Sequence, residues 1–290
     1  MLLLALSGWP DAAEAATRSV RELTRLLPAT RFASIDPEEF FDFTVHRPIV
    51  SNASDGNRKL SWVKNDFFYW RGEDHGIAAD RDILILLGAE PHLRWRAYRD
   101  AVLDVAVENN VDMLLVVGAL LAQVPHTRPA KVMGSASKMD LGPGLGRIKF
   151  PPPGYEGPSS MTSVLMEAMG QRGVPQVSLW GQCPHYLQVA NNPAVSLALL
   201  KELQLFLPTT LDLSRIERET EQFASTIARA LQSQTEIGAY VKRLEQEYDS
   251  ESSAQKREGP VETGDVLRDL EEFLRQRRQQ PNDDSGEKQP

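Results

Sequence analysis

Polar and ring-bearing side chains that follow short apolar segments are the residues of this sequence that could do chemistry. His126 titrates near neutral pH, and Arg128 offers a planar fork that suits a carboxylate or a phosphate. Together they indicate binding of an anionic group, with a histidine placed to transfer a proton. The complete candidate set is Trp9, Asp11, Glu90, His126, Thr127, Arg128, Tyr155, His185 and Tyr186.

Four apolar segments precede these residues, and each leads to a glycine. They are residues 2–6 before Gly8, 83–87 before Gly88, 113–117 before Gly118 and 177–180 before Gly181. Near-continuous apolar runs of this length are typical of strands in a parallel sheet that is buried on both faces. Amphipathic stretches between them predict helices over residues 11–27, 93–110, 160–172 and 193–207. The expected fold is therefore α/β.

The order of these elements would bring distant polar residues together. Open parallel sheets bind ligands in the crevice outside the carboxyl ends of their strands. A glycine after each strand would let the chain turn sharply and would bring the backbone close to a guest. We therefore expect the candidate residues to line one crevice at that edge of the sheet.

One stretch, residues 41–70, breaks the alternation of strands and helices. Asp55-Gly56-Asn57 is a strong turn signal between two extended segments and predicts a β-hairpin. The sheet is therefore expected to be mixed, although mostly parallel.

Structural roles compete with the chemical ones at these positions. Arg128 could pair internally with Glu90 or Asp11 and so join neighbouring strand ends. The segment that holds His126 and Arg128 is flanked by Pro125 and Pro129, and such loops are often rigid corners.

No catalytic constellation is complete in the sequence. Cys183 lies two residues from His185, too close along an extended chain for an ordinary nucleophile and base, and cysteines are often merely buried. His92, the two other histidines and Glu90 lack the spacing of a metal site. The glycine-rich residues 142–146 indicate a structural loop rather than a phosphate-binding one. The catalytic residues, if the protein is an enzyme, are therefore not identified by the sequence, and we predict no cofactor and no metal.

The composition bounds the class of protein. Of the 290 residues, 41% are hydrophobic and 25% are charged, with a net charge of −8. This acidic balance argues against a nucleic-acid partner, and no apolar run approaches the roughly 20 residues that span a bilayer. The apolar opening is too short for a secretory signal. The single cysteine, Cys183, suits a reducing compartment, so we expect a cytoplasmic protein with no membrane partner.

The character of the chain changes near Pro208. We predict an α/β core domain over residues 1–207 and a helical extension over 208–248, whose apolar residues recur on one helical stripe. Polar residues 249–262 predict a flexible linker. Residues 263–280 predict a short amphipathic helix, and 281–290 a disordered tail. These helices either pack against their own domain or a symmetry mate, or dock a different protein.

Several short motifs give the sequence a family resemblance. They span about residues 1–207 and resemble the proteasome assembly chaperone 2 family, while the helical extension resembles that of its actinobacterial members. In chain order the motifs are Gly8-Trp9 with Asp11, Glu90-Pro91 followed by Trp95, Pro125-His126-Thr127-Arg128-Pro129, Tyr155-Glu156-Gly157-Pro158, Pro184-His185-Tyr186 and Asn192-Pro193.

The resemblance implies a fold, an assembly state and a class of function. The fold is a phosphorylase/hydrolase-like three-layer α/β/α sandwich with appended C-terminal helices, and the assembly is a homo-oligomer, with a trimer favoured. Eukaryotic relatives help to assemble the proteasome core, and some chaperones of this class dock through a C-terminal hydrophobic-Tyr-any tail. This chain ends Lys288-Gln289-Pro290, so docking through such a tail is not expected.

We therefore expect a self-assembling protein-interaction or assembly-chaperone-like module, with a protein partner that binds the C-terminal helices. The alternative is an enzyme, or a binder of an anionic or nucleoside-like small molecule, that acts at the crevice beyond the strand ends.

Overall fold

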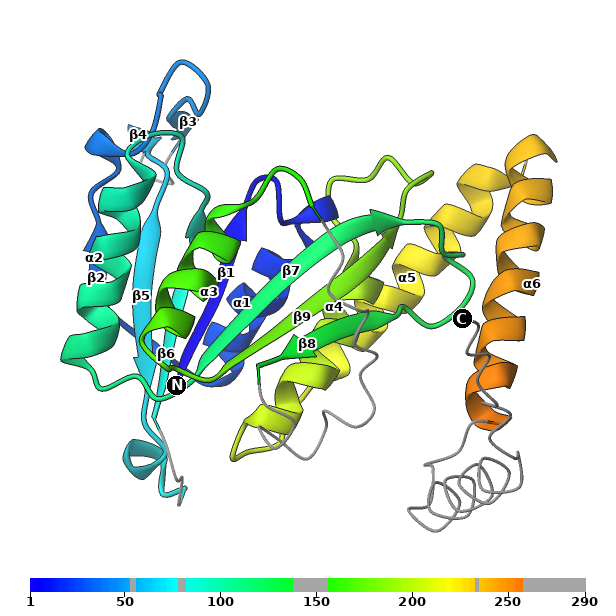
Figure 1. The fold of residues 1–290 in the computed structure, drawn as a ribbon. Helices are drawn as coiled ribbons and strands as arrows, with labels where there is room; N and C mark the ends of the chain where they lie inside the picture. The colour runs from blue at the N-terminus through cyan, green and yellow to red at the C-terminus, as the bar shows by residue number, and fades with distance from the viewer. Residues whose placement is uncertain (53–55, 78–81, 138–155, 233–234, 258–290) are drawn as a thin grey trace, which may run out of the picture. The chain divides into compact units, whose positions relative to one another are not determined.

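The computed structural model describes residues 1–52, 56–77, 82–137, 156–232 and 235–257 (Figure 1). The chain divides into two compact units, Met1–Leu244 and Glu245–Pro290. The first unit contains the nine strands of the described residues and all the candidate residues, of which Tyr155 lies outside those ranges.

A seven-stranded mixed sheet forms the centre of the first unit (Figure 1). Strands β6, β1, β7 and β9 are adjacent and parallel, whereas β2, β5 and β8 are antiparallel to their neighbours. This confirms the predicted mixed sheet with a parallel centre. In spatial order the strands are β2 (Thr30–Ile35), β5 (Asn65–Trp70), β6 (Ile83–Ala89), β1 (Leu2–Ser7), β7 (Leu114–Ala122), β9 (Gln176–Pro184) and β8 (Val132–Ala136).

Helices cover both faces of this sheet. On one face α1 (Ala15–Leu26) and α4 (Pro193–Leu203) share a buried apolar cluster with the strands. On the other face α2 (Trp95–Glu108) and α3 (Met161–Gln171) share a second cluster. The result is the expected three-layer α/β/α sandwich.

The leucine-rich central strand β1 supplies both of these clusters. Successive strand side chains point to opposite faces, so Leu3 and Ala5 join the cluster under α1 and α4, while Leu2, Leu4 and Leu6 join the one under α2 and α3. Full burial of each leucine side chain contributes about 1.5–3 kcal/mol. A strand in the middle of a covered sheet must therefore be apolar at every position.

The predicted hairpin exists, but it stands apart from the main sheet. β3 (Ile49–Asn52) pairs antiparallel with β4 (Arg58–Ser61) as a separate two-stranded sheet. The antiparallel members of the main sheet are other segments. Of these, β8 carries Gly134 and Ser135 in place of an apolar run, so hydrophobic patterning does not reveal it.

The helical extension is partly integrated into the first unit. Ile216 of α5 (Ser214–Leu231) belongs to the cluster under α1 and α4, and Val241 and Leu244 of α6 (Thr235–Arg257) are buried. These apolar residues are buried, and the division of the chain into two units falls after Leu244. The predicted core domain ended at residue 207. None of the helices in the described ranges is long and apolar enough to cross a membrane.

The start of the predicted linker is also helical. α6 continues to Arg257, so residues 249–257 belong to a helix, although 249–262 were expected to be flexible. The polar residues there include Glu, Gln, Lys, Arg and Ala, which are good helix formers despite the lack of an apolar stripe. The predicted helix over 263–280 and tail over 281–290 lie outside the described residues.

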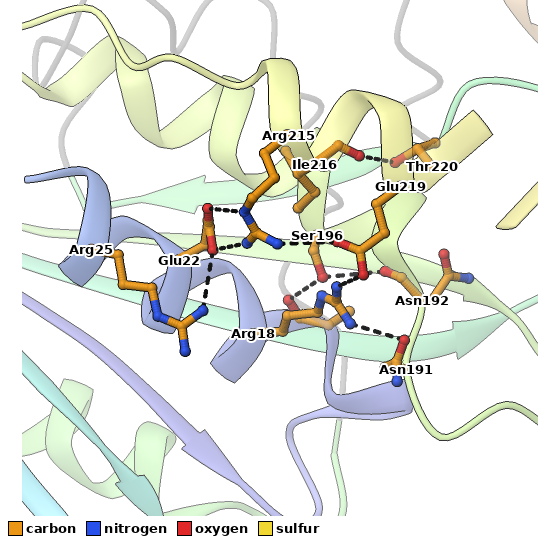
Figure 2. Close-up of polar contacts among 11 residues, drawn as sticks. Arg18, Glu22, Arg25, Asn191, Asn192, Ser196, Arg215, Ile216, Glu219 and Thr220 are labelled. Atoms are coloured by element: carbon orange, nitrogen blue, oxygen red, sulfur yellow. Dashed lines mark hydrogen bonds and ion pairs between the residues drawn. The ribbon is translucent and has the colours of Figure 1, made fainter. Parts of the chain in front are cut away.

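An ion-pair network joins α5 to α1 (Figure 2). Glu22 of α1 is buried and accepts two hydrogen bonds from Arg215 of α5, one of them from Nε at 3.2 Å. Arg18 of α1 donates to Glu219 of α5 and, at 2.9 Å, to the Asn191 side chain before α4. The network explains why a strongly charged helix packs as part of the core unit.

Candidate functional site

Three of the four glycines that were predicted to end strands lie inside them. The chain therefore does not turn at these glycines to form a crevice, as was expected. Gly88, Gly118 and Gly181 lie inside β6, β7 and β9. They provide space: a Cβ at Gly118 would lie 2.5 Å from the Trp180 ring, and one at Gly181 would lie 2.5 Å from Val195 of α4. The prediction of a sharp turn is right only for Gly8, which has a φ of 118°.

Asp11 is a buried cap of helix α1. Its Oδ1 accepts hydrogen bonds from the backbone N–H of Ala16 at 2.7 Å and of Thr17 at 3.3 Å, and its Oδ2 accepts one from the Thr17 hydroxyl. Burial raises the pKa of the Asp11 carboxyl above its ordinary value, while the hydrogen bonds from Thr17 and Ala16 oppose that rise. The carboxyl thus stabilises a helix start and is committed to that role.

Substitution of this cap has a definite expected cost. Asp11→Ala should lower the free energy of unfolding by about 1–2 kcal/mol, because two buried N–H groups lose their acceptor. Asp11→Asn is the matched control, since its amide oxygen still accepts these bonds and its loss should be much smaller. Urea unfolding of both variants measures the difference, and equal losses would contradict the capping role.

The same carboxyl should make stability depend on pH. Because its pKa is raised in the folded state, Asp11 contributes most below the ordinary value of 3.8, and this contribution is lost as the pH rises through the folded-state pKa. The stability of the wild type relative to Asp11→Asn should therefore fall over that window. Urea unfolding across the acid range tests this, and a constant difference between the two proteins would disprove it.

Glu90 connects β6 to the start of α3. Its Oε1 accepts a hydrogen bond from the backbone N–H of Met161 at 2.7 Å, the first residue of α3. Negative charge at a helix N-terminus interacts favourably with the helix dipole. Of the candidate residues, Glu90 and Trp9 line one pocket of about 540 Å³ with Asp42 and Trp95, and Trp9 is 63% exposed.

His126 and Tyr186 form a compact polar pair at the ends of β7 and β9. The Tyr186 hydroxyl accepts a hydrogen bond from the His126 backbone N–H at 2.8 Å and lies 2.7 Å from Nδ1 of the same histidine. The hydroxyl donates to Nδ1 when the neutral imidazole carries its proton on Nε2, and it accepts from Nδ1 when the proton is there. The histidine ring is thereby fixed in orientation.

His185 extends this cluster to helix α6. Its Nδ1 lies 3.1 Å from the Ala122 carbonyl oxygen, which it can reach only as a donor. Its Nε2 lies 3.3 Å from the Tyr240 hydroxyl, and the Tyr240 ring meets the rings of His185 and Tyr186 edge to face. Sequence reasoning missed Tyr240, although its spacing from Ile237 and Leu244 places it on the inner stripe of α6.

Removal of the Tyr186 hydroxyl should destabilise the contact between Tyr186 and His126. Tyr186→Phe keeps the ring contacts but removes both bonds to His126, and we expect a loss of about 1–2 kcal/mol. Tyr240→Phe removes only one long, exposed bond and should cost less than about 0.5 kcal/mol. Chemical denaturation measures both, and a loss from Tyr240→Phe that equals or exceeds the other would contradict this assignment.

His126, Thr127 and Arg128 line a second pocket of about 420 Å³. Helices α4 and α5 form its other walls, through residues such as Lys201 and Phe223. The pocket that contains Trp9 and Glu90 is lined by different residues. The candidate residues that line these pockets thus divide into two groups, and Asp11 serves as a helix cap. The pockets give no support to the predicted single crevice, which stays a prediction.

Nucleophile and metal chemistry find no support in the described part of the chain. Burial raises the pKa of the Cys183 thiol to about 12, and its Sγ donates to the Ala12 carbonyl oxygen at 3.3 Å. A thiol that stays protonated is a poor nucleophile. Within the described ranges, no group of three or more His, Cys, Asp or Glu side chains is arranged to hold a metal ion.

Comparison with known proteins identifies the relatives of this chain. A crystal structure of a PAC2 family protein from Streptomyces avermitilis MA is 33% identical, with a TM-score of 0.70 over 83% of this chain and 98% of that one. A Mycobacterium tuberculosis proteasome-assembly chaperone homologue is 31% identical, with a TM-score of 0.71 over 83% and 99% of the two chains. No curated protein matches the sequence.

A more distant structure shares the fold alone. The archaeal proteasome activator PbaB from Pyrococcus furiosus is 16% identical, with a TM-score of 0.60 over 79% of this chain and 92% of that one. The model of the PAC2 family matches residues 5–231, which include most of the described core and the whole of α5. The resemblance drawn from the motifs is confirmed, and the chain belongs to the PAC2 family.

Proposed function

We propose that this protein is a self-assembling protein-interaction module of the assembly-chaperone type, and that its working form is a homotrimer in the cytoplasm. The observation that carries the proposal is its similarity to the Mycobacterium tuberculosis proteasome-assembly chaperone homologue over nearly the full length of that chain. The PAC2 family match over residues 5–231 supports it.

The roles of the candidate side chains favour interaction over catalysis. Asp11 and Glu90 bind the N-termini of α1 and α3, and Tyr186 holds His126. A general acid or base needs a group that can exchange a proton with a substrate. Carboxylates committed to helix starts serve the framework instead, so the small-molecule alternative is not favoured.

The second unit, residues 245–290, is the proposed docking arm for a different protein. The buried residues of α5 and of the start of α6 belong to the first unit, so removal of everything after residue 207 would delete Ile216 and uncover the core cluster that it joins, which includes Leu199 and Leu203. Removal of residues 245–290 alone leaves the first unit complete. The structure therefore defines where a truncation should begin.

Two measurements on the full chain test this function. Native mass spectrometry should give the mass of three chains, and a monomer at every concentration would remove the self-assembly claim. Affinity purification from the native host should recover partners with the full chain and lose them with the chain that ends at Leu244. Circular dichroism should show that the truncated chain is still folded. If that chain recovers the same partners as the full chain, residues 245–290 are not the docking arm.

A further inference from the structure

The β3–β4 hairpin lies at one edge of the first unit (Figure 1), and it carries exposed apolar side chains. All residues of β3 and β4 are exposed, among them Ile49 at 69%, Val50 at 58% and Leu60 at 48%. Val50 and Leu60 are directly paired across the two strands. A two-stranded hairpin is marginally stable in water by itself, and clustered exposed apolar residues mark interaction surfaces.

The hairpin is anchored at its base, so its position is defined by the fold. Trp62, which follows β4, packs edge to face on Phe43 with ring centroids 4.7 Å apart. Phe43 packs in turn against the cluster under α2 and α3. A rooted, exposed hairpin is suited to docking on a surface outside its own core.

The charge of the hairpin specifies the surface that it fits. Arg47, Arg58, Lys59 and Lys64 are all exposed and lie on or beside the two strands. They form a basic element on a chain with a net charge of −8. A complementary surface must therefore combine acidic groups with apolar or aromatic side chains.

The same chain presents such a surface beside the ends of β1 and β6. The acidic pocket, of about 540 Å³, is lined by Trp9, Asp42, Val45, Glu90, Leu93 and Trp95. Trp9 is 63% exposed, Val45 72% and Leu93 50%. Carboxylates pair with guanidinium groups and tryptophan faces attract cations, so the pocket has both features that a basic, apolar hairpin requires.

The carboxylates of this pocket are held in place. Asp42 accepts hydrogen bonds from the backbone N–H and the hydroxyl of Thr44, at 2.8 and 2.6 Å. These bonds lower the pKa of the Asp42 carboxyl, the hydroxyl bond most strongly, which keeps it charged. Glu90 is fixed by its bond to the start of α3.

We infer that the basic hairpin of one copy of this chain docks in the acidic pocket of a second copy. Hairpin and pocket belong to one chain, but no hairpin residue lines the pocket. Each copy therefore offers one donor and one acceptor surface, and head-to-tail contacts of this kind form a ring when the rotation between successive copies closes. This inference rests on the self-assembly part of the proposed function and names its interface.

Charge reversal on both sides of the contact tests the inference with the full chain. Arg58→Glu with Lys59→Glu should raise the self-association Kd by about tenfold or more, and so should Asp42→Arg. A chain that carries all three substitutions should regain association, because its reversed hairpin meets the reversed pocket of the next copy at every contact. The matched control is Arg21→Glu with Lys242→Glu, which makes the same change of charge on exposed helix positions and should leave Kd unchanged.

Analytical ultracentrifugation separates the outcomes. A wild-type oligomer whose Kd is unaffected by the hairpin and pocket variants would overturn this interface but leave self-assembly intact. A wild-type monomer would overturn both. Binding of the wild-type hairpin to phosphatidylserine vesicles without self-association would also overturn the inference, since a basic apolar hairpin could serve an anionic membrane instead. Weakening by the separate hairpin and pocket variants, and recovery in the chain that combines them, would establish it.

Discussion

Gly88→Ala is expected to lower the free energy of unfolding by about 3–5 kcal/mol. A Cβ at this position in β6 would lie 1.8 Å from Oδ1 of Asn65 and 2.8 Å from its Cα. The backbone atom leaves no room for a small adjustment. Asn65 would have to move away from β6.

That movement would also break a buried polar contact. Asn65 is fully buried, and its Oδ1 accepts hydrogen bonds from the Ala89 backbone N–H at 3.0 Å and from the Tyr98 hydroxyl at 2.9 Å. Burial raises the pKa of Tyr98, so its hydroxyl stays protonated as a donor. Displacement would leave both donors buried without their acceptor, which adds to the cost of overpacking.

Chemical denaturation measures this effect against a matched substitution. Gly238 lies inside α6 with no atom within 4 Å of an added Cβ, so Gly238→Ala should raise stability by about 0.5–1 kcal/mol through helix propensity. Tyr98→Phe, which removes one hydrogen bond and no volume, should fall between the two. A Gly88→Ala protein as stable as the wild type would show that Asn65 has another conformation available.

Glu22→Ala is expected to lower the free energy of unfolding by about 2–3 kcal/mol, because it removes the carboxylate to which Arg215 binds (Figure 2). Loss of one partner from a buried pair usually costs more, but the Arg215 side chain is 54% exposed and can regain water. Since this contact ties α5 to α1, cleavage by a protease in residues 208–213 should become faster.

A glutamate of α5 that pairs with α4 provides the control. Glu217 of α5 pairs with Lys201 of α4 at 3.1 Å, and both side chains are about half exposed. Glu217→Ala should therefore change stability by less than about 0.5 kcal/mol. Similar losses from the two substitutions in urea unfolding would mean that general charge, and not the buried contact, holds α5.

Hydrophobic patterning predicts the centre of this fold well because burial on two faces leaves a clear signature. The four apolar segments are the four parallel strands, and the helices between them lie where the amphipathic stretches indicate. Hydrophobic patterning does not predict the outer strand β8, because this strand is half exposed and contains Gly134. The polar start of the predicted linker escapes it because α6 needs no apolar stripe to continue.

The candidate site could be predicted only in part, for two physical reasons. A glycine in a sequence can supply a positive φ or an empty volume, and its neighbours in space decide which; Gly8 does the first and Gly118 the second. In addition, the partners of Asp11 and Glu90 are backbone N–H groups, which every residue type except proline provides. Side-chain types alone therefore indicated a crevice where the fold uses these carboxylates as helix caps.

The central place of β1 has a consequence for synthesis of the chain. Leu2 pairs with Leu84 on one side and with Leu114 on the other, so β1 is synthesised before both of its partners and must wait for them. Until then it is an apolar strand with two open edges, which can pair with the wrong strand or with another chain. Contacts so distant in sequence also slow folding. The strand that completes the core is thus the one at greatest risk during translation.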